Sequence, residues 1–195
     1  MSVKWEIERS MLGQVGDEFL LNTLNNLYSM SLLEDGRLTD SLVKLSDFFR
    51  YQYRVAKLDK ISIEEEVQFL KSYFYLQRLR FNNQLDINFI YSIDRNHYIS
   101  PCVFFPLLSL SFQMLQRRVV DKLGFSVHLH AKENNIDLVL EILKPDNFKP
   151  SVFSAELDAC LENLRTEYKG QFKVSVEERL NQYVVGVVLT PWVDA

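Results

Sequence analysis

Residues 62–81 read SIEEEVQFLKSYFYLQRLRF, and this stretch separates a helical part of the chain from a strand-rich part. It opens with a capping-box pattern, because Ser62 can accept a hydrogen bond from the backbone of Glu65 while Glu65 reaches back to the cap. Its run of three glutamates suits the positive end of a helix dipole. Apolar residues then recur at steps of three or four. The stretch predicts a helix from Ser62 to about Phe81.

Two further helices are predicted before this stretch. Apolar residues recur at helical spacing from Trp5 to Leu33 and again from Leu42 to Tyr53, and Asp35–Gly36 breaks the pattern between them. Two helices joined by a short turn predict an antiparallel hairpin, which we assign to residues 1–57. Such a hairpin cannot enclose its own apolar residues, so its apolar stripe should pair with a second copy or with the rest of the chain. Of these, we expect a second hairpin that completes a four-helix bundle. The expected dimer interface comprises Leu12, Val15, Phe19, Leu27, Met30, Leu42, Leu45 and Phe49.

After residue 81 the apolar period changes from helical to two, which predicts strands. Two more helical stretches, roughly Pro101–Arg118 and Ala155–Tyr168, lie between the strands, and Asn134–Asn135 is expected to form a hairpin turn. We therefore predict an α+β fold in which residues 58–195 form a mixed sheet with helices on one face. About five strands are expected, at residues 85–89, 125–130, 136–142, 172–176 and 183–189.

Composition excludes several classes of function. The 195 residues carry 22 Lys and Arg against 26 Asp and Glu, a net charge of −4, so there is no basic excess for binding nucleic acid. The sequence has no apolar run long enough for a membrane helix, and its first ten residues, MSVKWEIERS, lack the apolar core of a secretory signal. Two cysteines make no disulfide framework, so we expect a cytoplasmic protein.

The histidines do not predict a metal site. His128 and His130 share one face of a strand whose other face is apolar, so we expect both to point toward water. No cysteine or carboxylate stands nearby at ligand spacing, and no metal site is expected. His97 lies in a polar loop and is expected to be exposed.

Four blocks of the sequence resemble one known family. Residues 14–25, QVGDEFLLNTLN, resemble the QxxPHFLFNxLN block of LytS/YehU-type sensor histidine kinases. Residues 45–51, LSDFFRY, are similar to the family's LSxxLRY. Glu65–Glu66 followed by residues 73–81, YFYLQRLRF, are similar to its EExxxxxxYLxIxxxRF. Residues 99–108, ISPCVFFPLL, resemble IPPxLLQPLV. The blocks occur in the family's order, and the resemblance extends from about residue 14 to residue 189.

The resemblance implies a dimerising helical hairpin that carries a phospho-accepting histidine, followed by a GHKL-type (Bergerat) ATPase domain. In active members the γ-phosphoryl group of ATP, bound with Mg²⁺, passes to that histidine and then to an aspartate of a response regulator. The family positions near the junction of the two parts include Arg50, Tyr51, Arg78 and Arg80. We interpret these residues as structural, paired with acidic residues such as Glu64–Glu66.

The sequence departs from the family at the phospho-acceptor and at the metal ligand. Glu18 occupies the position of the histidine, and a carboxylate cannot form phosphohistidine. Glu18 is either a solvated acidic residue of the helix surface or a permanent mimic of the phosphorylated state. The family's ENAxxH begins here with Ser109 and Leu110, so leucine replaces the asparagine that holds Mg²⁺. Leucine offers no oxygen ligand.

The adenine and phosphate elements also differ. Lys144 follows the third strand where the family has the element that reads adenine. Ser154 and Glu156 replace the glycines that let backbone N–H groups approach phosphate at a helix N-terminus. Glu156 brings negative charge to that point, which disfavours a polyphosphate. We expect no ATP and no metal to bind.

Together these departures favour a pseudokinase that acts in two-component signalling through dimerisation and partner binding, and they disfavour enzymatic activity. Two alternatives remain open. The chain could be a divergent active histidine kinase or ATP-binding sensor, or a non-catalytic partner that forms a heterodimer with an active family kinase. A homodimer is expected, with a response regulator or a related histidine kinase as further partner candidates.

Overall fold

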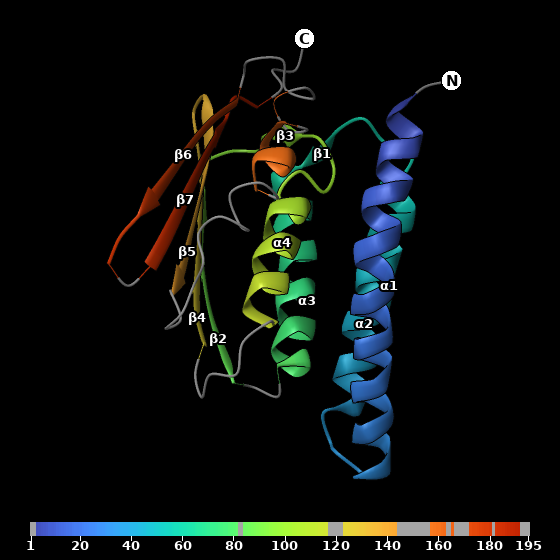
Figure 1. Cartoon of the computed structure of the whole chain (residues 1–195). Helices are drawn as coiled ribbons and strands as arrows, with labels where there is room; N and C mark the ends of the chain where they lie inside the picture. Colours follow the sequence, from blue (N-terminus) through green and yellow to red (C-terminus); the bar gives the residue numbers. More distant parts are fainter. Residues whose placement is uncertain are drawn as a thin grey trace.

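The computed structural model describes residues 3–81, 84–116, 123–143, 157–162, 165, 172–180 and 182–191. It begins with three helices, α1 (Val3–Leu32), α2 (Leu38–Val55) and α3 (Ile63–Arg80). The first two form the predicted antiparallel hairpin (Figure 1). No helix in these described ranges is both long enough and apolar enough to cross a membrane.

A five-stranded mixed sheet follows, in the order β2 (Leu85–Ile93), β4 (Leu123–Lys132), β5 (Asn135–Leu143), β7 (Gln182–Leu189) and β6 (Phe172–Glu178). Strands β2 and β4 are parallel and the other pairs are antiparallel. Helix α4 (Phe105–Gln116) crosses over between the parallel strands. The predicted α+β fold with a mixed sheet is confirmed.

Three layers result from this arrangement. Helices α3 and α4 lie between the sheet on one side and the α1–α2 hairpin on the other (Figure 1). Alternate residues of β4, β5 and β7 are buried beneath these helices, as the period of two predicts. The described helical turn at residues 157–162 buries Leu157, Cys160 and Leu161.

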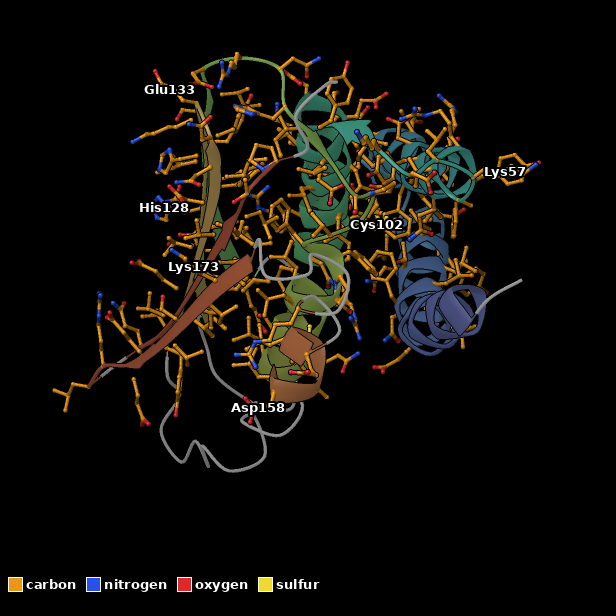
Figure 2. The ribbon with its side chains drawn as sticks, turned by 90° about the horizontal axis from the view of Figure 1, so that it is seen from above. Lys57, Cys102, His128, Glu133, Asp158 and Lys173 are labelled. Carbon is orange, nitrogen blue, oxygen red and sulfur yellow. The ribbon has the colours of Figure 1, made fainter. Side chains whose placement is uncertain are left out.

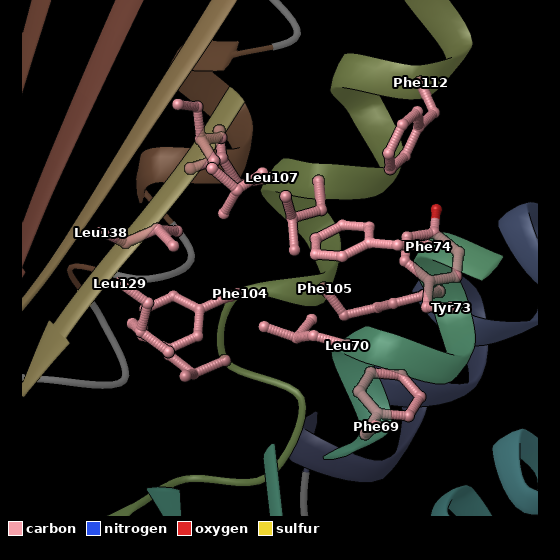
Figure 3. Close-up of a cluster of buried hydrophobic side chains, with 14 of the residues drawn as sticks. Phe69, Leu70, Tyr73, Phe74, Phe104, Phe105, Leu107, Phe112, Leu129 and Leu138 are labelled. Atoms are coloured by element: carbon pink, nitrogen blue, oxygen red, sulfur yellow. The ribbon is translucent and has the colours of Figure 1, made fainter. Parts of the chain in front are cut away.

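Aromatic side chains fill the space between the layers. Phe112 of α4 lies 4.8 Å from Phe125 of the sheet, measured between ring centroids. Tyr73 of α3 lies 5.0 Å from Phe105 by the same measure (Figure 3). Phe19 of α1 lies 5.4 Å from Tyr73. One hydrophobic core therefore runs from the sheet to the hairpin, across the predicted domain boundary at residues 57 and 58. That boundary stays a prediction.

Local signals in the sequence predicted the start of α3 correctly, but the start of α4 and the β4–β5 turn differ from the prediction. Ser62 caps α3, and its hydroxyl accepts a hydrogen bond from the Glu65 backbone N–H at 3.2 Å. Helix α4 begins at Phe105 rather than near Pro101, because Cys102 takes a left-handed backbone conformation (φ 56°) that no α-helix accommodates. The β4–β5 turn consists of residues 133 and 134, one position earlier than predicted, since the register pairs Lys132 with Asn135.

One small sheet was not predicted. Strand β1 (Ile61–Ser62) pairs antiparallel with β3 (Tyr98–Ile99). Two residues are too short to show an alternating pattern, and their partners lie almost forty positions away in the chain. The pair joins the start of α3 to the segment that leads into α4.

Candidate functional site

Glu18, at the position where the family has its phospho-acceptor, forms an ion pair with Arg80. The distance from the Arg80 Nη2 to the Glu18 Oε1 is 3.0 Å. Glu18 belongs to α1 and its side chain is 63% exposed, whereas Arg80 ends α3 and its side chain is only 6% exposed. Burial lowers the pKa of Arg80, and the negative charge of Glu18 opposes that shift. The pair connects the hairpin to the helix that begins the second part of the chain.

The expectation that Arg80 pairs with an acidic residue such as Glu64–Glu66 holds for the type of partner, but the partner is Glu18 rather than a residue of that run. Glu64, Glu65 and Glu66 lie in the first turn of α3, whereas Arg80 lies in its last turn, far along the same helix axis. Arg54 of α2 takes Glu65 as its partner at 2.9 Å, and Tyr51 of α2 donates a hydrogen bond to Glu66. Of the four residues expected to pair there, Tyr51 contacts the acidic turn. Arg50 instead pairs with Asp47 at 3.5 Å, and Arg78 donates a hydrogen bond to the Ile87 carbonyl.

A buried polar chain lies behind the ion pair. The Tyr73 hydroxyl accepts a hydrogen bond from Gln77 Nε2 at 2.7 Å and also bonds to Ser109 of α4. Burial raises the pKa of Tyr73 to about 12, so the phenol stays protonated at neutral pH. The electrostatic interaction with Tyr73 raises the pKa of Arg80, against the effect of burial. These side chains connect the acceptor position in the hairpin to α4, where Ser109 occupies the position of the family's acidic residue.

Helix α4 offers no side-chain oxygen at the position of the Mg²⁺ ligand. Leu110 stands there and packs against the hydrophobic core. The next residue, Ser111, is buried and donates its hydroxyl hydrogen to the Leu107 carbonyl at 2.8 Å. Among the residues that the structure describes, no group of three or more His, Cys, Asp or Glu side chains is placed to hold a metal ion. Lys144, Ser154 and Glu156 lie outside the described residues, so their part in the nucleotide site stays a prediction.

The residues predicted for the dimer interface separate into two sets. Phe19, Leu27, Met30 and Leu45 are buried within the single chain, where Phe19 lies 5.1 Å from Phe48 between ring centroids. These four line the contact of the hairpin with itself and with α3. Helical spacing identified the apolar face to which they belong, but it did not identify what covers that face. Leu42 and Phe49 are exposed. The side chains of Leu12 and Val15 lie outside the described residues.

The hairpin also exposes apolar residues that the predicted interface does not contain, in addition to Leu42 and Phe49. Leu21, Leu24, Tyr28 and Leu32 recur on α1 at steps of three and four, on the side opposite Phe19, and all four are exposed. On α2, Tyr53 is exposed together with Leu42 and Phe49 at helical spacing. We call these seven residues the outer stripe. The spacing that places Phe19, Leu27 and Met30 on one face was the signal that could have separated the stripe from the buried set.

The histidines behave in part as expected. Val127 and Leu129 are buried, and His128 lies on the opposite, outer side of the sheet (Figure 2). His130 shares a hydrogen bond of 2.9 Å with the Ser92 hydroxyl. The predicted exposure of His97 was wrong. Its ring is buried and its Nε2 lies 3.0 Å from Asp94 Oδ1, because the loop is held against the start of α3 by a hydrogen bond from the Ile63 N–H to the His97 carbonyl.

Comparison with known proteins relates the chain to sensor histidine kinases. A family model described as Histidine kinase matches residues 9–85. Sensor protein LytS of Staphylococcus saprophyticus is 30% identical over 90 residues, which are 46% of this chain and 15% of that protein. LytS of Staphylococcus haemolyticus is 23% identical over 186 residues, which are 92% of this chain and 30% of that protein. The chain thus spans less than a third of these relatives.

Solved structures support the fold. Histidine kinase AdeS of Acinetobacter baumannii superposes with a TM-score of 0.51 and 10% identity, over 93% of this chain and 95% of that one. The catalytic domain of histidine kinase ThkA gives a TM-score of 0.51 at 11% identity, over 68% of this chain and 96% of that domain. At such identities the likeness concerns the fold alone.

Proposed function

Because this chain is a member of the LytS-type sensor histidine kinase family, we propose that it is a pseudokinase that acts in two-component signalling through dimerisation and partner binding. The observation that carries this proposal is the ion pair of Glu18 with Arg80. The position that must present a nucleophilic ring nitrogen to ATP holds instead a carboxylate, already engaged by a guanidinium at 3.0 Å.

The environment of α4 supports the same proposal. Phosphoryl transfer depends on a metal ion that neutralises charge on the transferred phosphate, and Mg²⁺ takes oxygen ligands. Leu110 supplies hydrocarbon at that position, and it is partly buried against the core. Ser109 forms a buried hydrogen bond with Tyr73 rather than presenting a carboxylate. Replacements that fit their surroundings are typical of a protein adapted to a different role.

The pair also favours the phosphorylated-state mimic over a merely solvated Glu18. A phosphoryl group on a histidine adds negative charge that an arginine can bind. Glu18 carries such charge permanently, and Arg80 binds it. The hairpin of this chain is then held against α3 without any reaction.

Dimerisation would use the outer stripe of the hairpin. Its seven exposed apolar residues lie on two neighbouring helices, and a second hairpin would cover them in a four-helix bundle. Burial of apolar surface contributes roughly 25 cal/mol per Å². A homodimer covers the stripe with a second copy, whereas a heterodimer with an active family kinase covers it with a similar hairpin. A response regulator is a further candidate partner of either assembly.

Titration calorimetry with Mg-ATP tests the absence of nucleotide chemistry. We expect no binding heat at physiological ATP concentration, and no acid-labile phosphate after incubation with labelled ATP. Variants Leu110→Asn and the double variant Glu18→His with Leu110→Asn serve as matched controls, and we expect neither to gain activity. Micromolar affinity of the wild-type chain, or phosphohistidine on it, would overturn the pseudokinase proposal in favour of a divergent active kinase.

A further inference from the structure

Glu66 joins three segments of the chain at one buried carboxylate. It belongs to α3, and its side chain is completely buried. The Tyr51 hydroxyl of α2 donates a hydrogen bond to Glu66 Oε2, and the Cys102 backbone N–H donates to the same oxygen at 3.1 Å. Figure 2 shows Cys102 on the side of the central helices that faces the hairpin. The hairpin, α3 and the turn that leads into α4 therefore meet at Glu66.

The charged groups around Glu66 leave its charge poorly compensated. From α2, Tyr51 contacts it directly, and the Arg54 guanidinium lies 5.9 Å from the centroid of the Tyr51 ring. Arg54, however, pairs with the neighbouring Glu65 at 2.9 Å. From the turn before α4, Cys102 contributes a neutral N–H donor. A buried carboxylate with neutral donors is costly to ionise, because burial removes the water that stabilises its charge.

Burial accordingly raises the pKa of Glu66 to about 7, while the hydrogen bonds from the Tyr51 side chain and from the Cys102 and Phe104 backbone oppose that shift. Burial and the nearby Glu66 charge raise the pKa of Tyr51, so its phenol keeps the proton that it donates. When the hairpin leaves α3, Glu66 meets water and returns toward its ordinary pKa of 4.5. The docked arrangement therefore binds a proton that the separated arrangement releases.

We propose that Glu66 makes docking of the hairpin onto α3 and the α4 turn dependent on proton uptake near neutral pH. The carboxyl is raised in pKa on docking, so docking is strongest below the ordinary pKa of 4.5 and weakens as pH rises toward 7. Above about pH 7 both arrangements carry the charge and the dependence levels off. The docking equilibrium should fall about tenfold between pH 6 and pH 8. This inference does not depend on whether the chain binds ATP.

Hydrogen exchange of the full chain measures this dependence. The observable is the protection of α2 amides divided by the protection of β5 and β7 amides, which removes the intrinsic effect of pH on exchange. We expect the ratio to fall about tenfold from pH 6 to pH 8 in the wild type. Glu66→Gln should abolish the change, because an amide does not titrate. Glu65→Gln, at the neighbouring half-exposed position, should keep it.

A second variant distinguishes a proton-linked contact from a merely structural one. Tyr51→Phe removes a donor that stabilises the charged carboxylate, so it should move the titration of Glu66 to higher pH. Carboxyl-carbon NMR of Glu66 reads that titration directly. The proposal is overturned if Glu66 titrates near 4.5, if Tyr51→Phe lowers its midpoint, or if Glu66→Gln retains the wild-type dependence of α2 protection on pH.

Discussion

The hairpin and the sheet cover their inner faces alike but present different outer faces. Both bury apolar side chains against α3 and α4. On its outer face the sheet carries polar residues such as His128, His130 and Asp137 along its middle strands. The hairpin instead exposes the outer stripe, seven apolar residues at helical spacing on adjacent helices. On the outer face of the sheet, apolar residues such as Ile90 and Val139 are interspersed with the polar ones, whereas the exposed apolar residues of the hairpin recur at helical spacing, as in helices that bind a partner helix.

The sharpest test of this comparison uses two adjacent phenylalanines of α2. Phe48 is buried and contacts Phe19, Phe69 and Phe105, whereas Phe49 belongs to the outer stripe. Phe48→Ala should lower the free energy of unfolding by about 3–5 kcal/mol, because it leaves a cavity in the shared core. Urea denaturation at fixed protein concentration measures the loss. Phe49→Ala is the control, and equal losses in the two variants would show that the hairpin has no distinct inner face.

Charge placed on the outer stripe should affect assembly rather than folding. Leu24 of α1 and Val176 of β6 are each 46% exposed, so they form a matched pair on the hairpin and on the sheet. Leu24→Glu should raise the dimer dissociation constant at least tenfold, or about 1.4 kcal/mol, because a charge would have to be buried in the bundle. Val176→Glu should leave assembly unchanged. Sedimentation at micromolar concentration decides, and a monomeric wild type would contradict the homodimer and favour a heterologous partner.

The smallest expected effect is the coupling across the Glu18–Arg80 pair. A double-mutant cycle with Glu18→Ala and Arg80→Ala should yield about 0.5–1 kcal/mol, because Glu18 is mostly solvated although Arg80 is not. The same cycle for Glu177 and Arg179 at the end of β6, both well exposed at 2.9 Å, should yield less. Equal couplings would remove the distinction between the hairpin contact and an ordinary surface pair.

Sequence patterns predicted the elements of this fold well and their contacts poorly. The cap at Ser62 and the strand period are local signals, so they were readable residue by residue. The pairing of Glu18 with Arg80 joins positions 62 residues apart, and no local pattern specifies it. The polar neighbours of His97 predict an exposed loop residue, yet tertiary contacts bury it.

The same limit applies to the candidate site. Family resemblance identified Glu18 and Leu110 as departures, because each stands within a recognisable block of sequence. It included Glu66 in the family's EE pair but did not predict its contacts, because these come from burial beside Tyr51 and Cys102. The spacing of apolar residues assigns them to one face of a helix or strand, whereas the burial of that face depends on which other elements pack against it.

Strand β2 is placed to join the sheet late during folding. Its partner β4 follows only after α4, whereas β4 and β5 are connected by a two-residue turn and can pair almost immediately. Closing the longer loop costs more chain entropy, so parallel pairing with β4 should follow formation of the β4–β5 hairpin. The helical hairpin precedes α3 and α4 in the chain, so its inner face stays uncovered until those helices are made, and its outer stripe stays exposed even then. Its outer stripe is available to another hairpin throughout that interval, which couples the order of synthesis to the order of assembly.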